Sequence, residues 1–400
     1  MPVRRTGDVE SLILFRIAGG RLPVLPESVR AEGKPSVDWE RLLALAAVDN
    51  SVVVVARGLA TLPPGVVPAP VTEQLERLSK VWRFRLTMLE QRLAETLALL
   101  RHAGIGAVLL KGSALAVTTY GSFASRPMAD VDLLLEASRA EEAHELLQRS
   151  GWRWNDREHP AHAYEEHHHL TPLTDARGSG LEIEIHTEPL VDGHPFAYTS
   201  DDLRASAMTV TFAGVPVRVP EPHMHAVHAM THLAWSHRFE SGAWSTIRDI
   251  ATLVERGAIS WPTLVETARR TCAEASCYWT LRLARRLAGM SVPDETLEAL
   301  RPPMGESVMR RLESHFVHLL LRDDRACPSV AMRRRLWWIA MQPGADARVD
   351  EREWRRTPRA APDGVARRVF DTVHSMTRHA LRAPRWTRYV ASLVFPSYSL

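Results

Sequence analysis

Two aspartates one residue apart, Asp130 and Asp132, have the spacing in this chain that most directly suggests chemistry. Because side chains alternate across a strand, a strand near residue 130 points both carboxylates to one face, about 7 Å apart. Carboxylates this close repel each other unless a cation lies between them. Oxygen ligands suit Mg²⁺ or Mn²⁺, which keep their other positions for water and substrate phosphates. The pair predicts a metal-dependent site that handles phosphate.

A phosphate-binding turn is predicted just upstream. Residues 105–110 form a short apolar run with strand character, and Lys111, Gly112 and Ser113 follow it before a helix-compatible segment. Glycine lets the backbone approach phosphate oxygens, and amides at the start of a helix donate to anions. Ser113 adds a hydroxyl and Lys111 a compact positive charge. Only three of the 50 Lys and Arg residues are lysines, so composition does not explain a lysine at this turn.

A third carboxylate is expected on a neighbouring strand. Residues 181–186 alternate strictly between apolar and polar side chains, which places Glu182, Glu184 and His186 on one face. We predict that this strand forms a hairpin with residues 169–173. The site then has candidate acids on two strands.

In their order and spacing, these residues resemble the nucleotidyltransferase superfamily with a DNA polymerase β-like core. More narrowly, residues 108–186 resemble its group of uncharacterised nucleotidyltransferases. The residues that carry the resemblance are Lys111, Gly112, Ser113, Arg126, Asp130 and Asp132. The family pattern places an acid two residues before a histidine, which selects Glu184 ahead of His186 as the third carboxylate. Aspartate is commoner there, so this glutamate departs from the pattern.

The resemblance implies transfer of a nucleoside monophosphate from a nucleoside triphosphate, ATP most readily, to an acceptor hydroxyl with release of pyrophosphate. It assigns metal binding to Asp130, Asp132 and Glu184, with Mg²⁺ or Mn²⁺ as the cofactor. It assigns the β- and γ-phosphates to Gly112 and Ser113, and the charge of the leaving pyrophosphate to Lys111 or Arg126. The acceptor stays open among a small molecule, a peptide, a protein and an RNA. Relatives lie among genes for modified-peptide natural products, which favours testing a peptide.

The expected fold class is α+β, with a polymerase β-like core of a mixed sheet and helices flanked by N- and C-terminal helical regions. Residues 1–100 read as helical and include heptad-like apolar spacing after a proline-rich break at 62–65. Residues 101–222 form the catalytic core and include a hairpin that turns at Ala213 and Gly214. Residues 223–400 form a helical, arginine-rich region.

Composition limits the location and the partners. The longest uncharged apolar runs are shorter than the roughly 20 residues that span a bilayer, so we expect a cytoplasmic protein without a membrane span. Three cysteines, Cys272, Cys277 and Cys327, suggest reduced thiols. The last hundred residues carry 19 arginines and 10 acidic residues, a net charge of about +9. They form either a docking surface for an acidic partner or solvated helix faces.

Histidines leave two further questions open. His225, His228 and His232 share one helical face, and with Asp249 they form either a zinc site or polar packing. The run His167, His168 and His169 is expected to alternate along a strand, with an accessory or phosphate-contacting role at the site. A different class of function is a non-catalytic partner protein whose nucleotidyltransferase-like core binds a nucleotide or a peptide.

Overall fold

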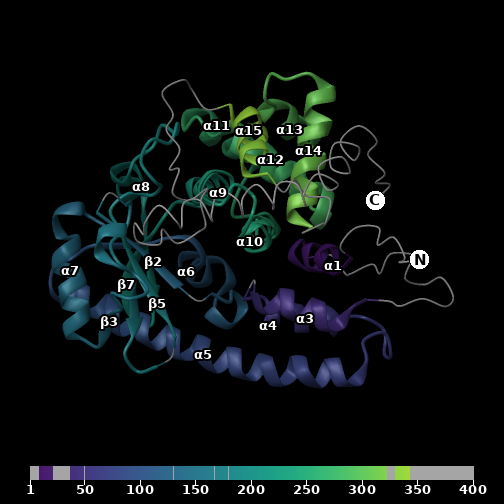
Figure 1. The fold of residues 1–400 in the computed structure, drawn as a ribbon. Coiled ribbons are helices and arrows are strands. Elements are labelled where there is room, and N and C mark those ends of the chain that lie inside the picture. Colours follow the sequence, from purple (N-terminus) through teal and green to yellow (C-terminus); the bar gives the residue numbers. More distant parts are fainter. Residues whose placement is uncertain are drawn as a thin grey trace, which may run out of the picture.

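The computed structural model of the chain describes residues 9–20, 37–48, 50–128, 130–165, 167–178, 180–321 and 329–342. In this part of the chain, one mixed sheet lies beside a large group of helices (Figure 1). The strands are β1 (Ala107–Leu109), β2 (Asp130–Leu135), β3 (Trp152–Trp154), β4 (Leu173–Asp175), β5 (Glu182–His186), β6 (Met208–Phe212) and β7 (Val215–Val219). Their order in the sheet is β3-β4-β5-β2-β1-β7-β6. The pairs β2·β5 and β1·β7 are parallel and the others are antiparallel.

Helices precede, interrupt and follow the sheet. The longer ones are α1 (Val9–Ala18), α3 (Trp39–Val48), α4 (Val52–Leu59), α5 (Ala69–His102), α7 (Ala137–Arg149), α8 (Ser200–Ser206), α9 (Pro222–Thr231), α10 (Ala243–Glu255), α11 (Trp261–Arg270), α12 (Glu274–Leu283), α13 (Asp294–Leu300), α14 (Glu306–Leu320) and α15 (Val330–Met341). Shorter segments are α6 (Lys111–Leu115), η1 (Ala116–Tyr120), η2 (Phe123–Ser125), η3 (Ala161–Ala163), η4 (His232–Ser236) and η5 (Ala284–Ala288). The fold class is α+β, as predicted.

The two faces of the sheet pack into different hydrophobic cores. Val131, Leu133 and Ile183 belong to a core that they share with α5 and α7. Val108 and Leu134 belong to a second core that contains α9, α10 and the later helices. Because side chains alternate along β2, Asp130 and Asp132 lie on the same face as Leu134. The acid pair therefore faces the C-terminal helices.

Helices from the two ends of the chain share that second core. α1 packs against α10 and η5, and Trp244 Nε1 donates a hydrogen bond to the Leu14 carbonyl at 2.7 Å. α5 runs beneath both the sheet and the helices α3 and α4 (Figure 1). It ends at His102 and α9 begins at Pro222, close to the expected limits of the catalytic core. The division into 1–100, 101–222 and 223–400 stays a prediction.

Several elements that were predicted from local sequence patterns are present in the structure. β6 and β7 form the hairpin that was predicted to turn at Ala213 and Gly214, and both turn residues have positive φ angles, 49° and 78°. This is the conformation of a tight two-residue hairpin turn. The apolar spacing before residue 100 corresponds to α5. The hairpin of β4 and β5 exists, but β4 begins only at Leu173, so the predicted strand at 169–173 is displaced.

Other expectations concern the surface and the thiols. Within the described ranges, no helix has the length and apolar character needed to cross a membrane. Cys272 and Cys277 are free thiols. Cys327 and most of the arginine-rich C-terminal segment lie outside the described residues.

Candidate active site

Carboxylates from two neighbouring strands meet on one face of the sheet. β2 and β5 pair in parallel, with Asp132 opposite Glu184 and Asp130 opposite Glu182. Residues that are paired in this way project to the same side. Alternation also places them on the face of Leu134, which packs toward the C-terminal helices. The candidate site therefore lies between the sheet and the helices that follow it in sequence.

The Asp132 carboxylate is the centre of a hydrogen-bond network. Its Oδ1 accepts from Lys111 Nζ at 2.7 Å and lies 2.9 Å from His186 Nε2. His186 Nε2 also lies 3.3 Å from Glu184 Oε2. Asp132 and His186 are buried. Lys111 and His186 thus bring positive charge or hydrogen-bond donors to carboxylates that would otherwise repel each other.

Three of these side chains could together hold one cation. Asp132, Glu184 and His186 each offer a ligand atom within 4.8 Å of the others. Asp130 is exposed and lies outside this group, one position further along the same face. The structure thus brings together two of the three predicted metal ligands and adds a histidine. Asp130 is placed at the solvent side, where Mg²⁺ would keep water and phosphate ligands.

The cluster changes the pKa values of its members. Burial opposes charge on Asp132, but the Lys111 ammonium and the His186 hydrogen bond hold the pKa of Asp132 well below its usual range. Burial opposes charge on Lys111 too, yet Asp132 and Glu184 raise the pKa of Lys111. Desolvation by surrounding atoms and repulsion from Asp132 and Glu184 raise the pKa of Asp130 to about 6. Because Asp130 also reaches solvent, we attribute its shift mainly to repulsion.

The turn ahead of the acids holds Lys111 in a rare backbone conformation. Lys111 begins α6 with a φ of 47°, a left-handed value that residues with a side chain seldom adopt. Such strain persists only where the surrounding structure enforces it, and it is frequent at functional sites. Here the strained residue also makes the ion pair with Asp132. The turn therefore fixes the ammonium beside Asp130, Asp132 and Glu184, which we name the acid cluster.

Gly112 and Ser113 have packing roles in the structure. A Cβ atom on Gly112 would lie 3.1 Å from the Arg126 guanidinium, so the glycine leaves room for that side chain. Ser113 is buried, and its hydroxyl donates to the Leu110 carbonyl at 2.8 Å. For this hydroxyl to donate to a phosphate, its hydrogen bond to the Leu110 carbonyl would have to break. The backbone amides at the start of α6 have no partner within their own helix and are the simpler donors.

Arg126 is close to the acid pair in sequence but is bound to a different carboxylate. Its Nε and Nη2 donate to the two oxygens of Asp249 at 2.6 and 2.8 Å, and its Nη1 donates to the Pro127 carbonyl. Tyr120 Oη also donates to Asp249, at 2.9 Å. Burial opposes the charge on Arg126, but Asp249 raises the pKa of its guanidinium. We name these three residues, Arg126, Asp249 and Tyr120, the Arg126–Asp249 junction; it connects the segment between α6 and β2 to α10.

Sequence reasoning missed this junction. Arg126 and Asp249 are 123 residues apart, and no spacing or motif connects them. The one available signal was that each is a charged residue close to apolar ones, and a charge that is buried requires a partner. That signal does not identify the partner.

For the histidines of α9 and η4, the alternatives were a zinc site with Asp249 and polar packing. His228 Nδ1 lies 3.2 Å from Tyr198 Oη, and His225 hydrogen-bonds to the main chain of α6. Among the described residues, the groups that could hold a metal include neither His225, His228 and His232 nor Asp249. Of the two alternatives, the structure fits polar packing, because Asp249 is paired at the junction and the imidazoles contact other groups.

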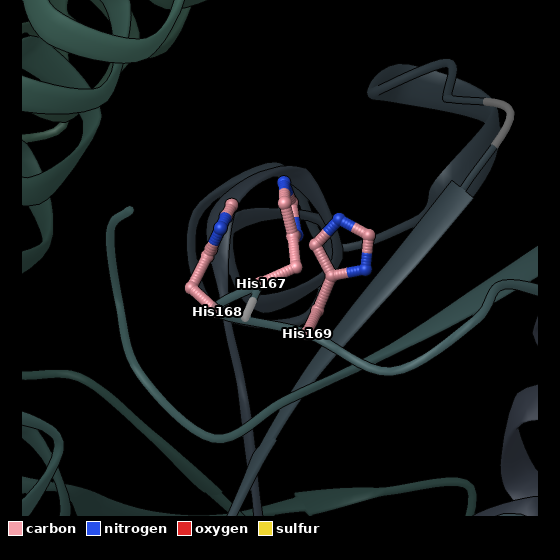
Figure 2. A group of neighbouring side chains, drawn as sticks. All are labelled: His167, His168 and His169. Atoms are coloured by element: carbon pink, nitrogen blue, oxygen red, sulfur yellow. The ribbon is translucent and has the colours of Figure 1, made fainter. Parts of the chain in front are cut away.

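His167, His168 and His169 were expected to alternate across a strand, and they do not. The first two lie in a bend, and His169 makes a single antiparallel bridge with His186. Figure 2 shows the three rings on the same side of the chain. The ring centroid of His167 lies 4.2 Å from each of the other two. The prediction of alternation is wrong because this segment is not a strand.

Comparison with known proteins identifies a family. A family model described as uncharacterised nucleotidyltransferase matches residues 35–289, which is more than half of the chain. No curated protein matches the chain. Among solved structures, the solution structure of the antibiotic-resistance factor ANT(2'')-Ia is similar, with 15% identity and a TM-score of 0.35. That similarity covers 50% of this chain and 98% of the other, and it is too weak to carry an argument about the site.

Proposed function

The chain belongs to the family of uncharacterised nucleotidyltransferases, and from this membership we propose that it transfers a nucleoside monophosphate from ATP to an acceptor hydroxyl, with release of pyrophosphate. Nucleotidyl transfer in general follows from the family. The nucleotide, the acceptor and the residues that act are our proposal. The observation that supports it most is the pairing of β2 with β5, which sets Asp132 opposite Glu184 beside Asp130.

A divalent metal fits this set of side chains. Asp130, Asp132 and Glu184 supply oxygen ligands of the kind that Mg²⁺ and Mn²⁺ prefer, and desolvation together with repulsion from the other two carboxylates raises the pKa of Asp130. We propose that these three residues hold the metal. When bound, the metal neutralises the carboxylates and offsets charge on the phosphates. His186 Nε2 donates to Asp132, lies near Glu184 and fixes the orientation of the Asp132 carboxylate.

Lys111 is the cation that we propose for the leaving pyrophosphate. Its ammonium is at the acid cluster and its side chain is 21% exposed, so it can reach a phosphate from there. Arg126 is a weaker candidate, since its guanidinium already makes a bidentate pair with Asp249. Gly112 and Ser113 would then seat the β- and γ-phosphates through their backbone amides. In this arrangement Arg126 supports the turn through its contact with Gly112.

The acceptor that we propose to test first is a peptide, in a cytoplasmic pathway to a modified-peptide natural product. The experiment incubates the purified protein with each nucleoside triphosphate labelled at the α-phosphate, with Mg²⁺ or Mn²⁺, and with host extract. Its control is the Asp130→Asn/Asp132→Asn double variant. We expect transfer of the ATP label to an acceptor only with the aspartates intact.

Two results would change the proposal. Transfer by the double variant would remove Asp130 and Asp132 from the site. If the protein binds ATP without transferring label to any acceptor supplied, the reading as a non-catalytic partner protein replaces the proposed activity.

A further inference from the structure

We propose that His167, His168 and His169 form a second metal site, which takes a transition-metal dication such as Zn²⁺. Each residue offers a ring nitrogen within 4.8 Å of those of the other two. The bend in the chain turns all three rings to one side (Figure 2). An extended chain would separate them, because successive side chains on a strand point to opposite faces. This local backbone therefore gathers ligands that a strand would disperse.

The hydrogen bond made by His169 leaves one of its nitrogens suited to a metal. His169 Nδ1 lies 2.7 Å from the Leu170 carbonyl, and a carbonyl only accepts, so Nδ1 carries the proton. Burial lowers the pKa of His169, which favours the neutral ring. Its Nε2 then has a lone pair. An imidazole that donates its other N–H to a carbonyl is the usual arrangement of a metal-bound histidine.

His168 provides an independent observation. It is 9% exposed, and its Nδ1 is buried without a hydrogen-bond partner among the described residues. A buried polar atom without a partner is costly and requires an explanation. Burial and the neighbouring histidines lower the pKa of His168, so this ring is also neutral. A metal ion bound by the three rings would give this side chain the partner that it lacks.

The donor atoms define the class of metal. Three imidazoles are borderline ligands that suit Zn²⁺, Co²⁺ or Ni²⁺, whereas Mg²⁺ and Mn²⁺ favour the oxygen ligands of the acid cluster. His169 Nε2 lies 3.9 Å from Glu184 Oε2, and the His168 and His186 ring centroids are 5.1 Å apart. The two sites therefore adjoin at Glu184 and His186. A dication held by the histidines would fix these two side chains beside Asp132.

The test is metal binding by the full chain, purified without a polyhistidine tag and freed of metal. Co²⁺ is the probe because its visible absorption reports its ligands and coordination. We expect one Co²⁺ per chain with a nitrogen-rich spectrum, displaced by Zn²⁺ and retained in excess Mg²⁺. The Asp130→Asn/Asp132→Asn variant should retain this spectrum. His168→Ala should weaken Co²⁺ binding by about 100-fold or more, since even outer-shell changes cost 10- to 100-fold.

His162→Ala is the matched control, because His162 is exposed and lies outside the group. It should bind Co²⁺ as the unaltered protein does. His168→Gln serves as a second variant, and circular dichroism shows whether each variant is folded. A spectrum lost in the double asparagine variant but kept in folded His168→Ala would assign Co²⁺ to the acid cluster and overturn the proposal. Absence of Co²⁺ binding by the unaltered protein would also overturn it, whatever the result for nucleotidyl transfer.

Discussion

The acid cluster on β2 and β5 and the Arg126–Asp249 junction are both groups of charged residues around a buried aspartate, and they differ in how completely the charge is balanced. At the junction, one guanidinium meets both oxygens of one carboxylate. The acid cluster has three carboxylates, those of Asp130, Asp132 and Glu184, beside two groups that can carry positive charge, Lys111 and His186. The cluster therefore keeps an excess of negative charge, whereas the junction has none.

This difference separates structural roles from chemical ones. A balanced, bidentate pair has little left to offer a ligand, and its loss leaves an uncompensated buried charge. An excess of carboxylate, by contrast, is stabilised by an added cation. Lys111 and Arg126 have the same sign and lie in the same sequence motif. From their partners we propose a chemical role for Lys111 and a packing role for Arg126.

Removal of the central carboxylate should produce the largest effect on activity. We expect Asp132→Asn to lower turnover by about 1,000-fold or more, because the metal loses a charged ligand. Its free energy of unfolding should fall as well, because the lowered pKa of Asp132 means that the charged carboxylate stabilises the folded state, but asparagine keeps a hydrogen-bond acceptor and we expect the protein to fold. Label transfer from the α-phosphate and urea unfolding measure the two quantities. Turnover within tenfold of the unaltered protein would contradict the role of the cluster.

The junction should show the opposite pattern. Asp249→Leu leaves the Arg126 guanidinium buried without its carboxylate, and we expect it to lower the free energy of unfolding by about 3–5 kcal/mol. The double variant Arg126→Met/Asp249→Leu should recover most of this loss, because neither charge remains. Urea unfolding of Asp249→Leu, Arg126→Met and the double variant tests the coupling. If Asp249→Leu costs less than about 1 kcal/mol, the junction is not the structural connection that we describe.

Two glutamates of β5, Glu184 and Glu182, should differ in how much their substitution lowers turnover. Glu184→Gln should lower turnover by about 100-fold, since Glu184 adjoins Asp132 and we assign it to the metal. Glu182→Gln, the matched control two residues earlier on the same face, should stay within about threefold. Glu182 lies opposite Asp130 and outside the group that gathers around Asp132. Equal losses in the two variants would show that the third carboxylate was wrongly chosen.

The sequence could predict what depends on neighbouring residues. The hairpin at Ala213 and Gly214 has alternating strands and a compact turn, and α5 has sustained apolar spacing, so both were predicted correctly. The facing of Asp132 and Glu184 also follows from local alternation, once β2 and β5 are known to be adjacent. Adjacency itself came from the family resemblance and not from any spacing.

What the sequence could not predict depends on contacts between distant segments. Asp249 pairs with Arg126 and Tyr120, which decides between the zinc site and the polar packing that helical spacing of the α9 histidines left open. Helical spacing places residues on one face but does not say what that face meets. The histidine run failed for a different reason. Its residues do not determine whether the chain bends there, and the bend decides where His168 points.

The smallest effect that we predict is a pH dependence of cation binding at the acid cluster. The pKa of Asp130 is raised to about 6, so this carboxylate is protonated below that pH and charged above it. A cation competes with the proton, and Mg²⁺ affinity should therefore fall by up to about tenfold for each pH unit below 6. Titration calorimetry at pH 5, 6 and 7 measures this slope. In Asp130→Asn, Mg²⁺ affinity should depend less on pH. An equal dependence on pH in that variant would assign the effect to another group, such as His186.

Mg²⁺ affinity should rise with pH, whereas the contribution of Asp130 to the stability of the metal-free protein should fall as the pH rises. The Asp130 pKa is 3.8 in the unfolded chain and about 6 in the folded one, so the folded state binds this proton more tightly. The group therefore favours folding fully below pH 3.8, and that contribution is lost as the pH rises to about 6. Above pH 6 the charged carboxylate opposes folding, and Asp130→Asn should then be more stable than the unaltered protein. Saturating Mg²⁺ should reverse this order, because only the charged carboxylate gains from the cation. If the order is the same with and without Mg²⁺, Asp130 does not bind the metal.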